Sequence, residues 1–479
     1  MKSFLSERFK KLSPPLLASA ALMFTQLIQK GLQLITAPIY TRLLTPDEYG
    51  QVSLFFSWYE IMVIFTGLCL SKGVFNNGMM EFKSERDKYT FSMYSLTFLS
   101  TCVVGSVVIL FSRFIYNFMK LPMNLICYMF VLLLFEAALS LWTVRQRFEY
   151  KWKLTTFITL SLAVLAPTVG ILSVILLPKY HVYGRIIGER TVFLLVYLFF
   201  VIYHARRAKF KISTQFWKFA LKFNLPLIPH YLSLHILNHM DRIMIASIID
   251  ESAAGIYSVA YSGAAVIKMF WQSINASLIP WTYEKCEKKD YKRLNDVTIV
   301  LVFTYAMICI IFMFLAPEIM QILAPKSYHE GIYIIPSVVA GVYFSALYYI
   351  FANVVYYYKM PKYVMIGSVV SAIVNIILNA IFIPIFGYIA AGYTTMASYM
   401  LQVFVDYIAM VKILKFNIYN MKIIGSVSAT VVLVGIALSF VFEYTIVRYL
   451  LLVIFIGFTA IYVIKNKEIF QQLLRRKKK

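Results

Sequence analysis

Charged residues are scarce in this chain, and acidic residues are the scarcest. Aspartate and glutamate together number 22 among 479 residues, against 46 lysines and arginines. Charged residues make up 14% of the chain, whereas a soluble domain carries about 25%. Hydrophobic residues reach 61%. This composition excludes an ordinary soluble globular protein and indicates a membrane-embedded chain.

Paired cysteines and alternating strand patterns are also lacking. The five cysteines have no paired spacing, which excludes a disulfide framework and a cysteine zinc site. The apolar stretches are continuous instead of alternating, and each of about eighteen residues or more can cross a hydrocarbon core of roughly 30 Å. Because a backbone in lipid must satisfy its own hydrogen bonds, continuous runs of this kind predict helices.

We therefore predict an all-α polytopic membrane protein with about fourteen transmembrane helices. Each helix is assigned to one apolar stretch bounded by charged or turn residues. The predicted helices span about 14–41, 51–70, 89–111, 122–142, 154–177, 184–203, 223–249, 255–281, 296–316, 331–357, 363–383, 388–411, 422–441 and 446–464.

The basic residues are distributed very unevenly over the predicted loops. If the amino terminus is cytoplasmic, 35 of the 46 lysines and arginines lie on the cytoplasmic side and seven lie on the other. Short cytoplasmic loops of membrane proteins carry such an excess. The net charge of +24 is thus explained by topology and by contact with anionic lipid, not by nucleic acid. We predict a multi-pass protein of the cell inner (cytoplasmic) membrane with both termini in the cytoplasm.

Two landmarks indicate an internal repeat. Gly50 and Gly255 follow predicted helices 1 and 7 in similar segments, 205 residues apart, and Pro178 and Pro384 end helices 5 and 11, 206 residues apart. A six-helix offset preserves orientation, so the repeat would be parallel, although chance matching of turn residues is the alternative. We predict lobes at 1–210 and 211–415, with additional helices and a basic tail at 416–479.

Three predicted helices carry polar stripes at the i, i+3, i+4, i+7 spacing of one helix face. A charge at the bilayer centre costs roughly 2.5–3.5 kcal/mol, so such side chains face a cavity or a neighbouring helix. The alternative to a functional cavity is hydrogen bonding between helices. The stripes consist of Gln26, Gln29, Lys30 and Gln33; Tyr231, His235, Asn238, His239 and Arg242; and Tyr261, Lys268, Gln272 and Asn275.

Four acids lie well inside predicted helices: Glu60, Glu136, Asp241 and Asp406. We assign Glu60, Glu136 and Asp241 to ion coupling. Arg185 and Glu189, four residues apart, are expected to pair.

His235 and His239 have the spacing of a metal pair, but no third ligand is evident, so no metal is predicted and proton handling is the alternative. The chain shows no nucleophile beside a general base and no large outer loop. We therefore predict neither an enzyme nor a cofactor.

Three segments resemble the polysaccharide-biosynthesis flippases of lipid-linked oligosaccharides, within the multidrug, oligosaccharidyl-lipid and polysaccharide exporter superfamily. They are Ala37 to Gly50 (APIYTRLLTPDEYG), Asp241 to Tyr261, and Asn375 to Gly387. The resemblance covers essentially the whole chain. It implies two six-helix lobes that form a V-shaped central cavity, and alternating access coupled to H+ or Na+. The implied substrate is an undecaprenyl-diphosphate-linked oligosaccharide, and a polysaccharide polymerase is an implied partner.

Within such a cavity, Lys30, Arg242 and Lys268 would attract a diphosphate or acidic sugars, because a desolvated anion needs fixed positive charge. The other side chains assigned to the substrate would donate and accept hydrogen bonds; these are Gln26, Gln33, His235, Asn238, His239, Tyr261 and Gln272. Three alternatives remain: a multidrug/cation antiporter, which would need acids lining the cavity; a membrane-embedded glycan polymerase or acyltransferase; and a lipid II transporter.

Overall fold

The computed structural model describes residues 14–465, and within this range no residue forms a β-strand. The predicted all-helical class is therefore confirmed. The contacts divide the chain into two compact units, residues 1–255 and 256–479.

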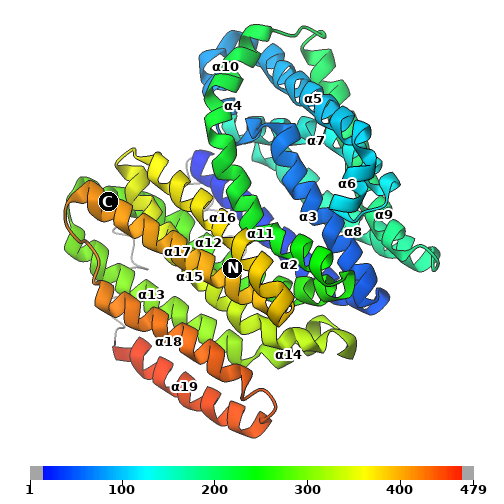
Figure 1. Ribbon diagram of the computed structural model, residues 1–479. Helices are drawn as coiled ribbons and strands as arrows, with labels where there is room; N and C mark the ends of the chain where they lie inside the picture. The colour runs from blue at the N-terminus through cyan, green and yellow to red at the C-terminus, as the bar shows by residue number, and fades with distance from the viewer. Residues whose placement is uncertain (1–13, 466–479) are drawn as a thin grey trace, which may run out of the picture. The chain divides into compact units, whose positions relative to one another are not determined.

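The first unit contains long helices joined by short helical turns (Figure 1). Within it, α8 packs along α9 and α2, and α3 packs along α11. Its elements are α2 (Pro14–Leu43), α3 (Pro46–Gly67), η1 (Leu70–Lys72), α4 (Val74–Glu81), η2 (Lys83–Glu85), α5 (Arg86–Leu110), α6 (Ser112–Met119), α7 (Met123–Phe148), α8 (Trp152–Leu176), α9 (His181–Arg207), α10 (Thr214–Asn224), η3 (Leu225–Leu227) and α11 (Ile228–Ile248). Helix α12 (Glu251–Glu287) begins in this unit and continues in the second.

The second unit is organised around α15 and α17, which pack along each other. Helix α16 lies along α17, and α18 and α19 lie along α13 (Figure 1). Its remaining elements are α13 (Tyr291–Phe314), α14 (Ala316–Leu323), η4 (Lys326–Ile334), α15 (Ile335–Tyr357), α16 (Pro361–Phe386), α17 (Ile389–Leu414), α18 (Met421–Ser439) and α19 (Thr445–Lys465).

Eleven helices in the described part of the chain are long and apolar enough to cross a membrane. Three helices that we also predicted to span are not among them: α2, α3 and α11. Their lengths of 30, 22 and 21 residues suffice for a crossing. They carry the polar residues of the predicted site, which lower their hydropathy. The count of about fourteen remains a prediction.

Gly50 on α3 and Gly255 at the start of α12 lie where these two helices cross closely. A Cβ on Gly50 would overlap the carbonyl oxygen of Glu251, and a Cβ on Gly255 would overlap the carbonyl oxygen of Pro46. Both helices also begin in the same way, because the Thr45 side chain accepts from the Glu48 amide and the Asp250 side chain accepts from the Ala253 amide. These caps are 205 residues apart, the same offset as the two glycines.

An ion pair attaches the start of α19 to α14. Both guanidinium amino groups of Arg448 donate to the Glu318 carboxylate, at 2.5 and 2.6 Å, and the Tyr449 hydroxyl donates to it at 2.6 Å. Burial raises the pKa of Glu318, but the hydrogen bonds from Arg448 and Tyr449 outweigh burial and lower the pKa to about 2. Glu318 therefore stays ionised well into the acid range.

We expect Gly50→Ala to lower the thermal unfolding temperature by on the order of 5 °C or more, or to prevent folding. The added methyl group would collide with backbone, which no side-chain rotation can relieve. Fluorescence-detected unfolding of the detergent-purified chain measures the effect. Gly31→Ala is the matched control, because a Cβ on Gly31 meets no atom within 4 Å. Equal unfolding temperatures for the two variants would contradict the close crossing.

We expect Glu318→Gln to lower the unfolding temperature at neutral pH by roughly 2–4 °C, because a partly exposed ion pair contributes about 1 kcal/mol at most. The folded-state pKa of Glu318 lies below its ordinary value of 4.5, so the contribution is present above pH 4.5 and disappears as the pH falls toward 2. The difference between wild type and variant should shrink over that window. A difference independent of pH would contradict the ion pair as its cause.

Candidate functional site

A cavity of about 220 Å³, lined by apolar and polar side chains, lies within the first unit. Its acids, its lysine and its histidine come from four elements far apart in the sequence: Glu60 from α3, Lys72 from η1, Glu136 from α7 and His235 from α11. This volume is below the range of about 300–1,000 Å³ typical of small-molecule sites. The cavity therefore fits water, a proton or a small ion, and an oligosaccharide would not enter it.

A reversal of the chain after α3 brings Lys72 to this cavity. Leu68 and Cys69 both adopt left-handed backbone conformations, with φ of 49° and 53°. This region costs a residue with a side chain about 1–2 kcal/mol. The buried Asn224 side chain donates to the Leu68 carbonyl oxygen at 2.9 Å and holds the reversal in place.

Lys72, His235 and Glu60 form a row of polar groups. The Lys72 Nζ lies 3.1 Å from His235 Nε2, and His235 Nδ1 lies 3.8 Å from a Glu60 carboxylate oxygen. Because an ammonium group can only donate, Nε2 accepts and the proton of a neutral imidazole is on Nδ1, facing Glu60. Lys72 also lies 5.0 Å from the Tyr231 ring, a cation–π contact. The row links a fixed cation to a carboxylate through an imidazole.

The second carboxylate of the cavity, Glu136, is held from another side. The buried Tyr59 hydroxyl donates to it at 3.0 Å. Behind Tyr59, the guanidinium of Arg190 lies 5.0 Å from the Tyr59 ring and 4.5 Å from the Phe56 ring. Glu60, Glu136 and Lys72 thus all line the cavity. The Arg190 guanidinium stacks on the aromatic rings next to it.

The structure supplies the third donor that the sequence did not show for a metal. One ligand atom each from Glu60, His235 and His239 can be chosen so that all lie within 4.8 Å of one another. Glu60 comes from a different helix, which explains why the spacing of the histidines did not reveal it. The Lys72 ammonium beside His235 opposes a divalent cation here.

The polar stripe of α2 lies on an exposed face. Gln26, Lys30 and Gln33 are all exposed, and Lys30 makes no ion pair with any residue that the structure describes. On the other predicted stripe of this unit, the Arg242 guanidinium donates to the Asn238 carbonyl oxygen at 2.8 Å. Asp241, the neighbour of Arg242, is buried. These residues line neither hollow described for this unit.

The α12 stripe, within the second unit, ranges from buried to exposed. Tyr261 is buried, Lys268 is half-buried and Gln272 is exposed. Asn275, one turn beyond Gln272, accepts a hydrogen bond from Asn353 at 2.9 Å. This contact is hydrogen bonding between helices, the alternative considered for polar residues in spans.

The predicted pair of Arg185 and Glu189 is wrong, since no ion pair joins them among the described residues. The Arg185 guanidinium lies instead 3.5 Å from the centre of the Tyr40 ring and 5.1 Å from the centre of the Tyr49 ring. Stacking on aromatic rings satisfies a guanidinium without a carboxylate.

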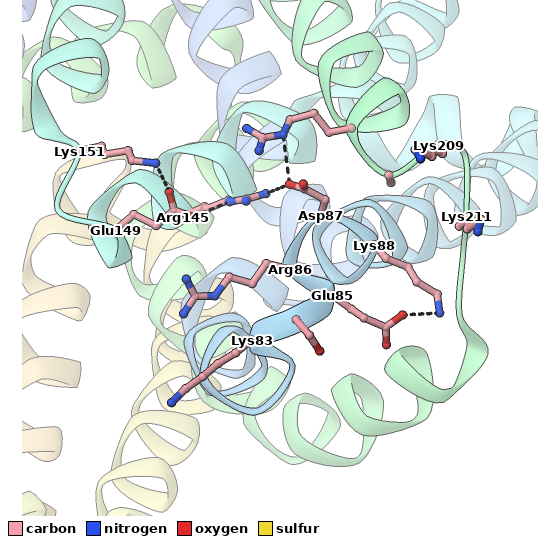
Figure 2. A pocket seen from close by; sticks show the side chains of 13 residues that line it. Lys83, Glu85, Arg86, Asp87, Lys88, Arg145, Glu149, Lys151, Lys209 and Lys211 are labelled. Carbon is pink, nitrogen blue, oxygen red and sulfur yellow. Dashed lines mark hydrogen bonds and ion pairs between the residues drawn. The ribbon is translucent and has the colours of Figure 1, made fainter.

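A second hollow, of about 760 Å³, lies at the ends of α5, α7 and α9 and is strongly basic (Figure 2). Its acids are all engaged: Arg145 bridges Asp87 and Glu149, and Lys88 pairs with Glu85. Burial raises the pKa of Glu149, but hydrogen bonds from Lys151 and Arg145 outweigh burial and lower it. Within the described chain, four cations of this hollow have no ion pair: Lys83, Arg86, Lys209 and Lys211.

Sequence reasoning missed Lys72, Tyr59 and Arg190. Lys72 lies in a segment between two predicted helices, and the left-handed Leu68 and Cys69 ahead of it leave no recognisable turn motif. Arg190 lies inside a predicted helix, and the cost of burying a cation there was the available signal.

Known proteins resemble this chain in sequence and in fold. Residues 18–285 match a family model described as polysaccharide biosynthesis protein. Protein 1 of the Lsg locus of Haemophilus influenzae is 24% identical over 370 residues, which cover 73% of this chain and 87% of that protein.

Two solved structures share the fold. The lipid II flippase MurJ, in an inward closed conformation, superposes with a TM-score of 0.67 at 16% identity, covering 96% of this chain and all of that chain. An inward-facing multidrug resistance MATE family transporter of the MOP superfamily gives 0.63 at 13% identity, covering 83% and 98%. At these identities the likeness establishes the fold alone.

We expect Lys72→Met to create measurable Zn2+ binding in the first cavity. The change removes the positive charge beside His235 and leaves Glu60, His235 and His239 as donors. Zn2+ affinity should rise at least about tenfold, which corresponds to about 1.4 kcal/mol. Calorimetric titration of the purified chain measures it.

Lys83→Met is the matched control, because Lys83 lies in the second hollow. Adding His235→Ala to Lys72→Met should abolish the gain. If wild type and Lys72→Met bind Zn2+ equally, Lys72 does not control what this cavity accepts.

Proposed function

The chain belongs to the polysaccharide biosynthesis protein family, and from this membership we propose that it carries lipid-linked oligosaccharides across the membrane. The substrate would be an undecaprenyl-diphosphate-linked repeat unit, moved from the inner to the outer leaflet of the cytoplasmic membrane by alternating access. The product would serve the synthesis of a surface polysaccharide by a polymerase. The family match over residues 18–285 carries this proposal.

The intramembrane cations support an anionic headgroup as cargo. Lys30 is exposed on α2 without an ion pair to any described residue, although a lysine in a span is costly. A diphosphate would supply the missing counter-charge. We assign Lys30, Arg242 and Lys268 to the diphosphate, and the neighbouring amides and hydroxyls of the stripes to the sugars.

The small cavity suits a different role. Its volume excludes an oligosaccharide, and its residues can exchange protons or hold a small cation. We therefore assign His235 and His239 to ion coupling instead of substrate binding. Glu60 and Glu136 keep their assignment to ion coupling. Asp241 keeps its assignment to ion coupling.

The basic hollow supports the predicted orientation. Its unpaired lysines and arginine would face the anionic lipid of the inner leaflet, where each basic residue near the surface contributes about 1 kcal/mol. In this orientation the start of α5 and the ends of α7 and α9 would lie in the cytoplasm. Both termini would then be cytoplasmic as well.

We expect Lys30→Gln and Arg242→Gln each to lower surface polysaccharide at least about tenfold while membrane abundance stays normal. Loss of one charge-assisted contact to a phosphate costs roughly 1.5–3 kcal/mol. Immunoblots of polymer and of the chain, in a deletion strain carrying each variant, provide the measurement.

Lys30→Arg, which keeps the charge, should retain part of the polymer. Lys179→Gln is the matched control, since Lys179 lies exposed beyond the end of α8. Normal polymer in both Lys30→Gln and Arg242→Gln would refute the diphosphate site. Normal polymer combined with hypersensitivity of the deletion strain to cationic drugs would favour a multidrug antiporter.

A further inference from the structure

A strip of buried polar side chains runs between α16 and α17 in the second unit. On α16 the polar residues lie three or four positions apart and share one face, and on α17 they follow a four-residue spacing, with Thr395 added beside Thr394. All are buried. The strip consists of Ser368, Ser371, Asn375 and Asn379 on α16, and of Thr394, Thr395, Ser398, Gln402 and Asp406 on α17.

In one half of this strip, the polar side chains are hydrogen-bonded to groups of α16 and α17. Asn375 donates to the Thr395 hydroxyl at 3.0 Å, and the Thr394 hydroxyl donates to the Asn379 side-chain oxygen. Ser398 donates to the Thr394 carbonyl oxygen at 2.7 Å. The two bonds between asparagine and threonine side chains join α16 to α17, as polar side chains join helices in a membrane. This half therefore needs no ligand.

In the other half, several side-chain oxygens lack a hydrogen-bond partner within the described chain. Both carboxylate oxygens of Asp406, the side-chain oxygen of Gln402 and the hydroxyl of Ser371 have no hydrogen-bond partner within the described chain. Each of these residues is 0% exposed. The Gln402 amide nitrogen is already used, since it donates to the Ser368 hydroxyl at 3.1 Å. Four oxygen atoms thus lack partners at the Asp406 end of the strip.

The packing leaves room for the carboxyl group. A Cβ on Gly367 would lie 3.3 Å from Asp406 Oδ1, closer than most side-chain contacts, so glycine on α16 keeps this place open. No described lysine or arginine forms an ion pair with Asp406. An ionised carboxylate buried without a partner is strongly unfavourable, and such a group takes up a proton or a cation.

We propose that Asp406 is a proton-binding site in the second unit, and that its proton takes part in the coupled transport cycle. A protonated carboxyl gains a donor, and the Gln402 side-chain oxygen, one turn earlier on the same face, is an acceptor without a partner. A hydrogen bond from the protonated carboxyl to this oxygen would satisfy both groups with one proton.

Among the described residues, no ion pair of a basic side chain with Asp406 would replace the proton. The titratable group that faces Asp406 from α15 is Tyr348. From α16 the neighbours are Gly367, Ser368 and Ser371, none of which titrates. The site differs from Glu60, Glu136 and Asp241, to which coupling was assigned from the sequence. Its role in transport rests on the proposed function, whereas its protonation does not.

Infrared difference spectroscopy of the purified full chain tests the protonation directly. A protonated carboxyl gives a carbonyl stretch that shifts in D2O. We expect this signal in wild type at neutral pH, its absence in Asp406→Asn, and its retention in Asp296→Asn, which removes an exposed acid of the same unit. If Asp406→Asn does not accumulate, Gly367→Ala should shift the same signal by crowding Oδ1. An ionised Asp406, a signal unmoved by Gly367→Ala, or a signal lost on adding Na+ would overturn the proposal.

The functional arm measures surface polymer. Asp406→Asn, a neutral side chain of equal size, should lower polymer at least tenfold at unchanged abundance and unfolding temperature, and Asp406→Glu should restore part of it. A protonated Asp406 combined with normal polymer in Asp406→Asn would overturn its part in coupling. The infrared result requires no substrate, so it stands or fails independently of the diphosphate site.

Discussion

A polar group placed in hydrocarbon must find a partner inside the protein, and this constraint determines where the polar side chains of the chain lie. Insertion scales assign roughly 2.5–3.5 kcal/mol to a charge at the centre of a span. Helices α3 and α11 each carry such groups, and they pack along each other. Glu60 and His235 therefore meet. The same constraint accounts for the reversal after α3, since two left-handed residues place Lys72 opposite these groups.

Positive and negative groups occur together in the small cavity, whereas positive charge is in excess at the helix ends. In the small cavity, Lys72 lies beside His235 and faces two carboxylates, so positive and negative groups are present together. In the basic hollow every acid forms an ion pair, whereas four cations form none with the described residues. The excess is tolerable there because headgroups and solvent screen it. A composition poor in acids thus produces a cavity with charges of both signs and a basic end.

Much of the fold could be predicted because the cost of exposing polar backbone to lipid acts on every residue of a span. The apolar runs located the long helices, and the repeat offset located two capped helix starts. The short helices α4, α6, α10 and α14 escaped prediction because eight to eleven amphipathic residues resemble a loop. Arg185 shows why pairing rules fail in an aromatic-rich chain, since a tyrosine ring took the place of the expected carboxylate. The third donor near His235 and His239 could not be found, because contacts between helices leave no trace in local spacing.

The two units surround their intramembrane acids differently, and this difference bears on how protons could act. In the first unit Glu60 and Glu136 share a cavity with Lys72, so two carboxylates and one ammonium carry one net negative charge, and one proton neutralises the group as a whole. In the second unit Asp406 has no ion pair in the described chain, so its own proton removes its charge. The first cavity can distribute a proton between two acids beside a fixed cation. The acid between α16 and α17 has no such neighbour, so its neutral state depends on its own proton.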